Sequence, residues 1–115
     1  MYYVFVCKLI KSAKHSITLV DNYIDETVLT MFSKNSKIKA AIYTKNISDK
    51  LKLDIIKYNA QYKNLELKYF DLSHDRFLIV DDEIYHIGAS LKDLGKKWFA
   101  FNKMEKDSFR QFVFV

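Results

Sequence analysis

The segment Arg76–Val80 constrains the fold of this 115-residue sequence more than any other. Its residues, RFLIV, are almost continuously apolar, which is typical of a β-strand buried on both faces. Asp81 and Asp82 follow as turn residues, and residues 83–87 predict a returning strand. A buried strand needs partners on both sides, so this hairpin predicts a sheet built around a core.

Shorter strands and helices alternate along the chain before this hairpin. Further strands are predicted at residues 16–20, 37–43, 65–70 and 98–101. Helices are predicted at residues 2–14, from residue 25 and at 48–61, with a short helix or turn at 91–97. Alternating strands and helices followed by a hairpin predict an α/β fold, in which a mixed β-sheet carries helices on both faces.

The helix at 48–61 shows both a start signal and an apolar side. Ser48 is a plausible N-cap, because its hydroxyl can accept a hydrogen bond from the first turn. We expect the buried side to consist of Leu51, Ile55, Ile56 and Tyr58.

Length and composition indicate one domain over residues 1–115, either a whole protein or a fragment of a longer one. The single cysteine, Cys7, cannot form an internal disulfide, and it favours a reducing, cytoplasmic location. We expect Cys7 to be a buried structural thiol, since its neighbours are apolar. The sequence shows no signal peptide and no apolar run long enough to span a bilayer, so we expect no membrane partner.

The formal net charge of +5 bears on the partner. An excess of lysine favours a polyanion such as nucleic acid. The alternative is a lysine-rich solvated surface with no polyanionic partner. Charge alone favours the solvated surface.

His74 and Arg76 flank Asp75 where the buried strand begins. Residues two apart in a strand point to the same face, so we expect the imidazole and the guanidinium side by side. Such a pair suits a phosphate, because the guanidinium binds oxygens while the imidazole attacks phosphorus or transfers a proton. The structural alternative is that His74 bonds a nearby carboxylate and that Arg76 pairs with Asp75 or Asp82.

Small residues follow the returning strand, beginning with Gly88, one of only two glycines. Small side chains let backbone N–H groups approach an anion closely. We therefore predict phosphate binding by Arg76, Gly88, Ala89, Ser90 and Lys92. The alternative is that Ser90 caps the next turn and Lys92 is simply solvated. No cluster has the spacing of a zinc or magnesium site, so we expect no metal and no other cofactor.

The spacing of these residues resembles the phospholipase D superfamily motif, His-x-Lys-x4-Asp-x6-Gly-Ser-x-Asn. His74, Asp81 and Gly88 stand at the family's positions. Three positions differ, with Arg76 for Lys, Ala89 for Ser and Leu91 for Asn. The resemblance covers most of the chain as one phospholipase D-like half-unit.

The resemblance implies a metal-independent phosphodiesterase whose catalytic residues are His74, Arg76 and Asp81. His74 would form a phosphohistidine, Arg76 would hold the phosphate, and Asp81 would anchor the turn. A second histidine must protonate the leaving oxygen, so the resemblance implies a homodimer with the site on its two-fold axis. Nucleic acid is the expected substrate among phosphodiesters, which makes the protein a nuclease.

The second hypothesis is an inert phospholipase D-like domain that binds nucleic acid or a protein. It follows from the three altered positions, because each lost oxygen-stabilising donor can be worth about 3 kcal/mol in a transition state. Salt-sensitive binding without turnover would distinguish this hypothesis from the enzyme.

Overall fold

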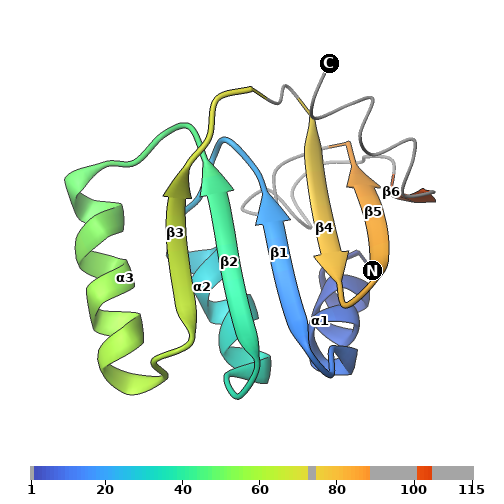
Figure 1. The fold of residues 1–115 in the computed structure, drawn as a ribbon, viewed down its shortest axis with the longest axis horizontal. Helices are drawn as coiled ribbons and strands as arrows, with labels where there is room; N and C mark the ends of the chain where they lie inside the picture. Colours follow the sequence, from blue (N-terminus) through green and yellow to red (C-terminus); the bar gives the residue numbers. More distant parts are fainter. Residues whose placement is uncertain (1, 73–74, 89–100, 105–115) are drawn as a thin grey trace.

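The computed structural model describes residues 2–72, 75–88 and 101–104 and confirms the α/β class (Figure 1). One mixed sheet contains six strands in the order β3-β2-β1-β4-β5-β6. The strands are β1 (Ser16–Val20), β2 (Lys39–Thr44), β3 (Leu65–Tyr69), β4 (Arg76–Val80), β5 (Glu83–Ile87) and β6 (Phe101–Met104). The helices are α1 (Tyr2–Ser12), α2 (Glu26–Phe32) and α3 (Asp49–Gln61), with a 3-10 turn, η1 (Ser33–Asn35), after α2.

Strand direction gives the sheet two distinct ends. β1 pairs in parallel with β2, and β2 pairs in parallel with β3. β4 is antiparallel to β1, and β5 is antiparallel to β4. The last residues of β1, β2, β3 and β5 therefore meet the first residue of β4 at one end, which we call the carboxyl edge. The opposite end, the amino edge, lies at the bottom of Figure 1.

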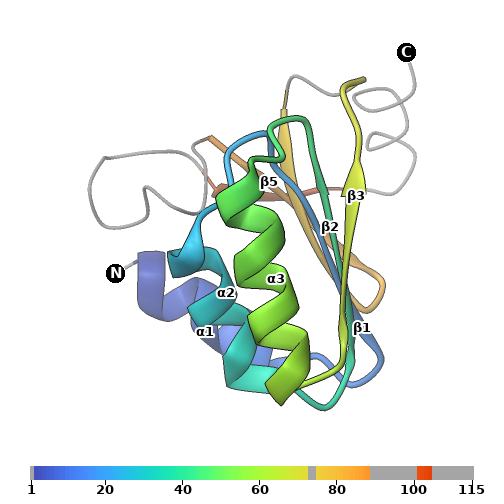
Figure 2. The same ribbon diagram turned by 90° about the vertical axis from the view of Figure 1, so that its left-hand side faces the viewer.

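The three helices described by the structure all cover the same face of the sheet (Figure 2). One core cluster joins alternate residues of the strands to all three helices, for example Ile10 of α1, Phe32 of α2 and Leu51 of α3. This arrangement differs from the expectation of helices on both faces. Both β–α–β crossovers, through α2 and through α3, lie on one side, because right-handed connections that progress in one direction along a sheet stay on one face.

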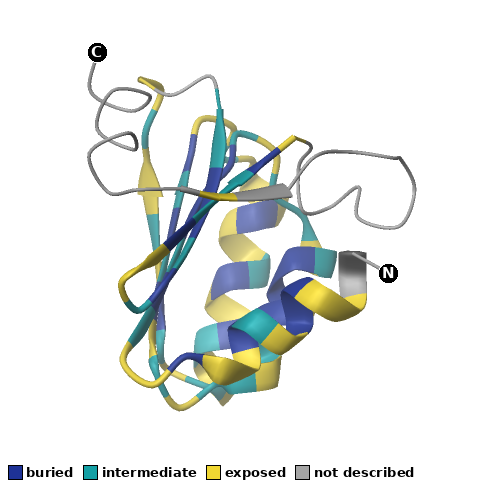
Figure 3. Cartoon of the chain, turned by 90° about the vertical axis from the view of Figure 1, so that its right-hand side faces the viewer, coloured by how far each residue is buried: buried dark blue, intermediate teal, exposed yellow. Residues whose placement is uncertain are grey.

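The other face of the sheet carries a smaller apolar cluster. Val20, Phe77 and Ile84 are buried there, and Tyr43 and Phe70 pack against them. Figure 3 shows that buried residues continue through the strands and the inward sides of the helices. β4 thus contributes to both clusters, which confirms that it is buried on both faces.

Polar side chains fix where α2 and α3 begin. The Asp25 carboxylate accepts a hydrogen bond from Thr27 N–H, and the Ser48 hydroxyl accepts one from Leu51 N–H at 3.0 Å. The Ser48 cap is the one that the sequence predicts.

The buried side of α3 consists of Leu51, Ile55 and Tyr58. Its fourth expected member, Ile56, is 65% exposed, so that prediction is wrong. Leu51, Ile55 and Tyr58 recur at helical spacing, whereas Ile56 lies about 100° around the helix from Ile55.

Two asparagines connect elements through their side-chain amides. Asn35 donates to the carbonyls of Ile10 and Ala13, at 3.0 and 2.9 Å, and so satisfies the end of α1. Asn59 on α3 donates to Leu65 C=O and accepts from Leu65 N–H, at 2.8 and 3.0 Å. The Asn35 contacts join η1 to the end of α1, and the Asn59 contacts join α3 to β3.

The predicted boundaries agree closely at β1, β4 and β5 and shift by one or two residues at β2, β3 and the three helices. The predicted end of the last strand, at residue 101, is wrong, because β6 ends at Met104. The segment 91–97 and the start of the strand predicted at 98–101 lie outside the described residues. Cys7 is buried, as expected. Within the described part of the chain, no helix has the length and apolar character needed to cross a bilayer.

Candidate functional site at the carboxyl edge

Arg76 lies at the carboxyl edge, where β4 begins. Its Nε atom is 3.8 Å from an oxygen of Asp21, the residue after β1. Asp21 is fully buried, whereas the Arg76 side chain is 28% exposed. A buried carboxylate requires compensation, and the guanidinium supplies positive charge. The Asp21 carboxylate also accepts a hydrogen bond from Tyr23 N–H at 3.1 Å.

Asp21 is not among the site residues that the sequence predicts, and Asp75 or Asp82 is the partner expected there for Arg76. The signal was present, because an acidic residue directly follows the buried strand Ser16–Val20. Antiparallel pairing then decides the contact: Val20 lies opposite Phe77, so the next pair in that register is Asp21 and Arg76.

Thr44 extends the same polar row on the other side of Asp21. Val20 pairs with Tyr43 in the parallel ladder, so Thr44 is level with Asp21. Both residues are fully buried, and the Thr44 hydroxyl has no hydrogen-bond partner among the residues that the structure describes. Thr44, Asp21 and Arg76 therefore form a polar row across three strands at the carboxyl edge.

The β4–β5 hairpin brings two parts of the sequence motif to this edge. Arg76 pairs with Ile87, so Gly88 follows immediately beside the start of β4. His74, Ala89, Ser90 and Lys92 lie outside the described residues. Their predicted roles therefore stay predictions.

Asp81 lies at the amino edge, at the other end of β4 from Arg76. Five residue steps at about 3.3 Å separate the two, or about 17 Å along the strand. The Asp81 carboxylate accepts hydrogen bonds from the N–H groups of Lys14, His15 and Ser16, at 3.0, 2.7 and 3.1 Å. It ties the β4–β5 turn to the segment that joins α1 to β1.

This environment favours the charged form of Asp81. The hydrogen bond from Lys14 N–H is the largest influence that lowers the pKa of the Asp81 carboxyl, and those from His15 and Ser16 act in the same direction. Partial desolvation opposes them but does not reverse the shift. Asp81 also has a φ of 53°, in the left-handed region that Asp tolerates better than most residues. These contacts hold the β4–β5 turn against the segment before β1.

A second polar pair lies beside Arg76 on the hairpin. His86 Nε2 is 3.2 Å from an oxygen of Asp75, and the His86 ring packs against Phe77 at 5.4 Å between centroids. Phe77 belongs to the cluster on the face without described helices, so this pair and Arg76 occupy opposite faces of the hairpin. His86 is not among the site residues that the motif spacing predicts.

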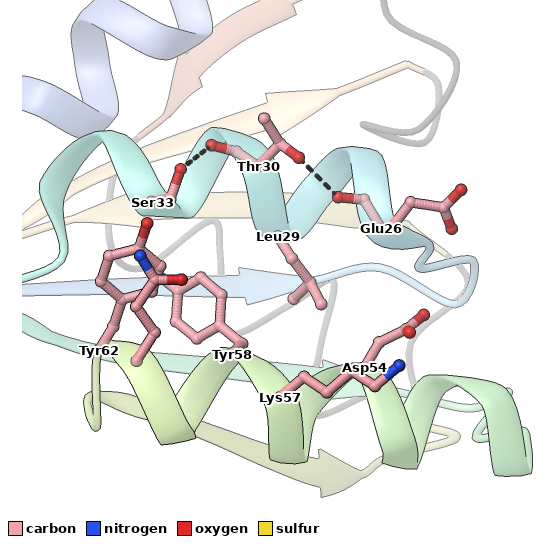
Figure 4. A pocket seen from close by; sticks show the side chains of 9 residues that line it. Glu26, Leu29, Thr30, Ser33, Asp54, Lys57, Tyr58 and Tyr62 are labelled. Atoms are coloured by element: carbon pink, nitrogen blue, oxygen red, sulfur yellow. Dashed lines mark hydrogen bonds between the residues drawn. The ribbon is translucent and has the colours of Figure 1, made fainter.

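A hollow of about 290 Å³ lies between α2 and α3, away from the carboxyl edge (Figure 4). Glu26 and Asp54 face it together with Lys57, and Tyr58 and Tyr62 close one end. Burial is the largest influence on Tyr58 and raises its pKa to about 12, so its phenol stays neutral. In the described part of the chain, no three His, Cys, Asp or Glu side chains gather as metal ligands would.

No protein-family model and no curated protein sequence matches the chain. Solved structures that share its fold include the following two. One is TrmBL2, an archaeal chromatin protein whose structure shows a novel mode of DNA binding, with a TM-score of 0.61 and 22% identity. The other is NucT from Helicobacter pylori, with a TM-score of 0.67 and 14% identity.

The coverage of these two proteins differs. The alignment with TrmBL2 covers 92% of this chain but only 43% of the TrmBL2 chain. The alignment with NucT covers 96% of this chain and 86% of that chain. At these identities the likeness concerns the fold, and we conclude that the chain has the α/β fold seen in TrmBL2 and NucT.

Proposed function

We propose that this chain is a phospholipase D-like phosphodiesterase that acts on nucleic acid as a homodimer. The observation that carries the proposal is the pairing of Arg76 with Ile87, which brings Arg76 beside Gly88 at one edge. Buried Asp21 next to Arg76 supports it, because an arginine held by a carboxylate keeps a defined place while part of it reaches solvent.

In the proposed reaction, His74 attacks phosphorus and the bond to the leaving oxygen breaks. That oxygen takes a proton from His74 of a second copy. Water then attacks the phosphohistidine, gives its proton back to that second histidine, and releases the phosphate ester and free His74. Arg76 and backbone N–H groups at Gly88, Ala89 and Ser90 bind the non-bridging oxygens, Lys92 adds positive charge, and Asp81 anchors the turn.

The test is cleavage of bis(p-nitrophenyl) phosphate and of DNA or RNA in the presence of EDTA. We expect turnover by the native chain and none by His74→Ala. His15→Ala is the matched control, because His15 is exposed at the amino edge. Cleavage that persists in His74→Ala would contradict the proposal. Sedimentation analysis should show a dimer.

A second candidate function is DNA binding without cleavage. The shared fold with TrmBL2, whose structure shows DNA binding, favours it. So do the three altered motif positions, Arg76, Ala89 and Leu91. Its signature is salt-dependent binding that persists in His74→Ala, together with no turnover in the native chain.

A further inference from the structure

The described charges are unevenly distributed between the two ends of the sheet. At the carboxyl edge, acidic residues outnumber basic ones around Arg76: Asp21, Asp25, Glu26, Asp49, Asp71 and Asp75 lie in or next to the loops there. A polyanion would meet repulsion from the exposed carboxylates among them, such as those of Asp49 and Asp71. Among the residues that the structure describes, a surface away from this edge is therefore better placed to attract nucleic acid.

The amino edge carries lysines around a second hollow. This hollow has a volume of about 510 Å³ and is lined by the start of β2, the end of α3 and the start of β3. Lys37, Lys39 and Lys63 line it, and all three are exposed. We call these three residues the lysine triad. Three like charges around one hollow repel one another, so the arrangement favours an anion between them.

No described residue neutralises the lysine triad. None of its three side chains forms an ion pair or a hydrogen bond with any residue that the structure describes. The single carboxylate in the hollow, Glu66, is 3.4 Å from Lys68 Nζ and is therefore already paired. By contrast, Lys57 shares the α2–α3 hollow with the carboxylates of Glu26 and Asp54.

Lys63 occupies a position at which its residue type is unfavourable. Its φ is 59°, in the left-handed region, directly after Tyr62 caps the end of α3. Glycine or asparagine is the usual choice there. A cation at this position does interact favourably with the end of the helix dipole. That effect explains Lys63 alone. It does not explain why Lys63 is grouped with Lys39 at the start of β2 and with Lys37 in the loop before it.

The geometry points to the lysine triad as a binding surface for the phosphate backbone of duplex DNA. The inference rests on the nucleic-acid partner of the proposed function and places much of the attraction for it away from the motif edge. Lysine suits this task, since it contacts phosphates as a mobile point charge without reading bases. The surface therefore binds DNA irrespective of its sequence.

The test is fluorescence anisotropy of a labelled 20-base-pair duplex at several salt concentrations between 50 and 200 mM. If all three lysines contact phosphates, Lys37→Gln/Lys39→Gln/Lys63→Gln lowers the slope of log K against log salt by about 2.7. The matched control, Lys45→Gln/Lys52→Gln/Lys57→Gln, removes the same charge elsewhere and should change the slope by less than about 1. Replacing the triad by arginine should retain binding. Urea unfolding checks that each variant is folded.

The inference is overturned if the two triple variants weaken binding equally, if the lysine triad variant binds as tightly as the native chain, or if the native chain does not bind the duplex. These outcomes are independent of cleavage. A chain that binds through the triad without hydrolysing any ester contradicts only the phosphodiesterase. A chain that hydrolyses bis(p-nitrophenyl) phosphate while the triad variant binds DNA normally contradicts only this inference.

Discussion

Asp81 accepts the N–H of His15 at 2.7 Å, a contact between residues 66 positions apart in the sequence. With the bonds from Lys14 and Ser16, it fastens the β4–β5 hairpin to the start of β1. The Asp81 N–H also donates to Ser16 C=O at 2.9 Å. One residue therefore fixes the end of β4 opposite Arg76.

We expect Asp81→Asn to lower the urea midpoint of unfolding, because the neutral amide accepts fewer and weaker hydrogen bonds than the carboxylate. Asn tolerates the positive φ, so the loss reports on charge rather than on backbone strain. Glu66→Gln, which breaks an exposed pair with Lys68, is the control and should change the midpoint less. Equal effects would show that Asp81 is not the anchor.

The same carboxylate makes stability depend on pH. Since folding lowers the pKa of Asp81, its contribution is complete above the unfolded value of 3.8 and is lost as pH falls through the lower folded value. The difference in urea midpoint between the native chain and Asp81→Asn should therefore be constant near pH 7 and shrink below about pH 4. A difference that grows on acidification would contradict this assignment.

Asp21 and Arg76 should be energetically coupled. A double-mutant cycle with Asp21→Asn and Arg76→Gln is expected to give an interaction energy of about 0.5–3 kcal/mol in urea unfolding. Arg76→Gln alone should destabilise the fold, since it leaves the Asp21 carboxylate buried without this cation. A parallel cycle with Asp21→Asn and Lys57→Gln should show no coupling. Additive effects in the first cycle would mean that the 3.8 Å contact contributes nothing.

Asn35 should stabilise the helix layer through the end of α1. Asn35→Ala removes the donor to Ile10 and Ala13 carbonyls, and we expect a loss of about 1–3 kcal/mol in the free energy of unfolding. Asn35→Asp keeps the shape but turns a negative oxygen toward these carbonyls, so it should be at least as damaging. Ser36→Ala is a neighbouring control. An unchanged unfolding curve for both Asn35 variants would refute this role.

The cap of α3 offers a prediction of smaller size. Ser48→Ala should cost about 1 kcal/mol of unfolding free energy, because Leu51 N–H loses its acceptor. Ser48→Asp retains an acceptor and a favourable charge at the helix start, so it should recover most of the loss. If alanine and aspartate behave alike, the hydroxyl is not acting as a cap.

Local pattern was sufficient for most of the fold. The runs at 16–20, 76–80 and 83–87 contain their own strand and turn signals, and Ser48 has the side chain that a cap needs. The face of the sheet on which each helix packs could not be predicted in this way. It depends on the order of strands in the sheet, which no single segment encodes. Ile56 shows the same limit, as an apolar residue can remain exposed when its neighbours already fill the buried side.

Only those residues of the candidate site that lie close together in the sequence could be predicted. Spacing predicts Arg76, Asp81 and Gly88, and hairpin pairing explains why Arg76 and Gly88 share an edge while Asp81 lies at the other. Asp21 and the Asp75–His86 pair depend on strand register, and the lysine triad depends on three segments meeting. Those relationships arise from pairing and packing rather than from proximity in the sequence.

The amide of Asn59 has a consequence for how the protein meets its own copies. β3 is an outer strand of the sheet, and the outward N–H and C=O of Leu65 are already occupied by Asn59. A strand from another molecule could extend the sheet past Leu65 only by breaking both bonds. The Asn59 side chain thus hinders the addition of a strand from another molecule at this sheet edge, which is the route by which open sheets aggregate.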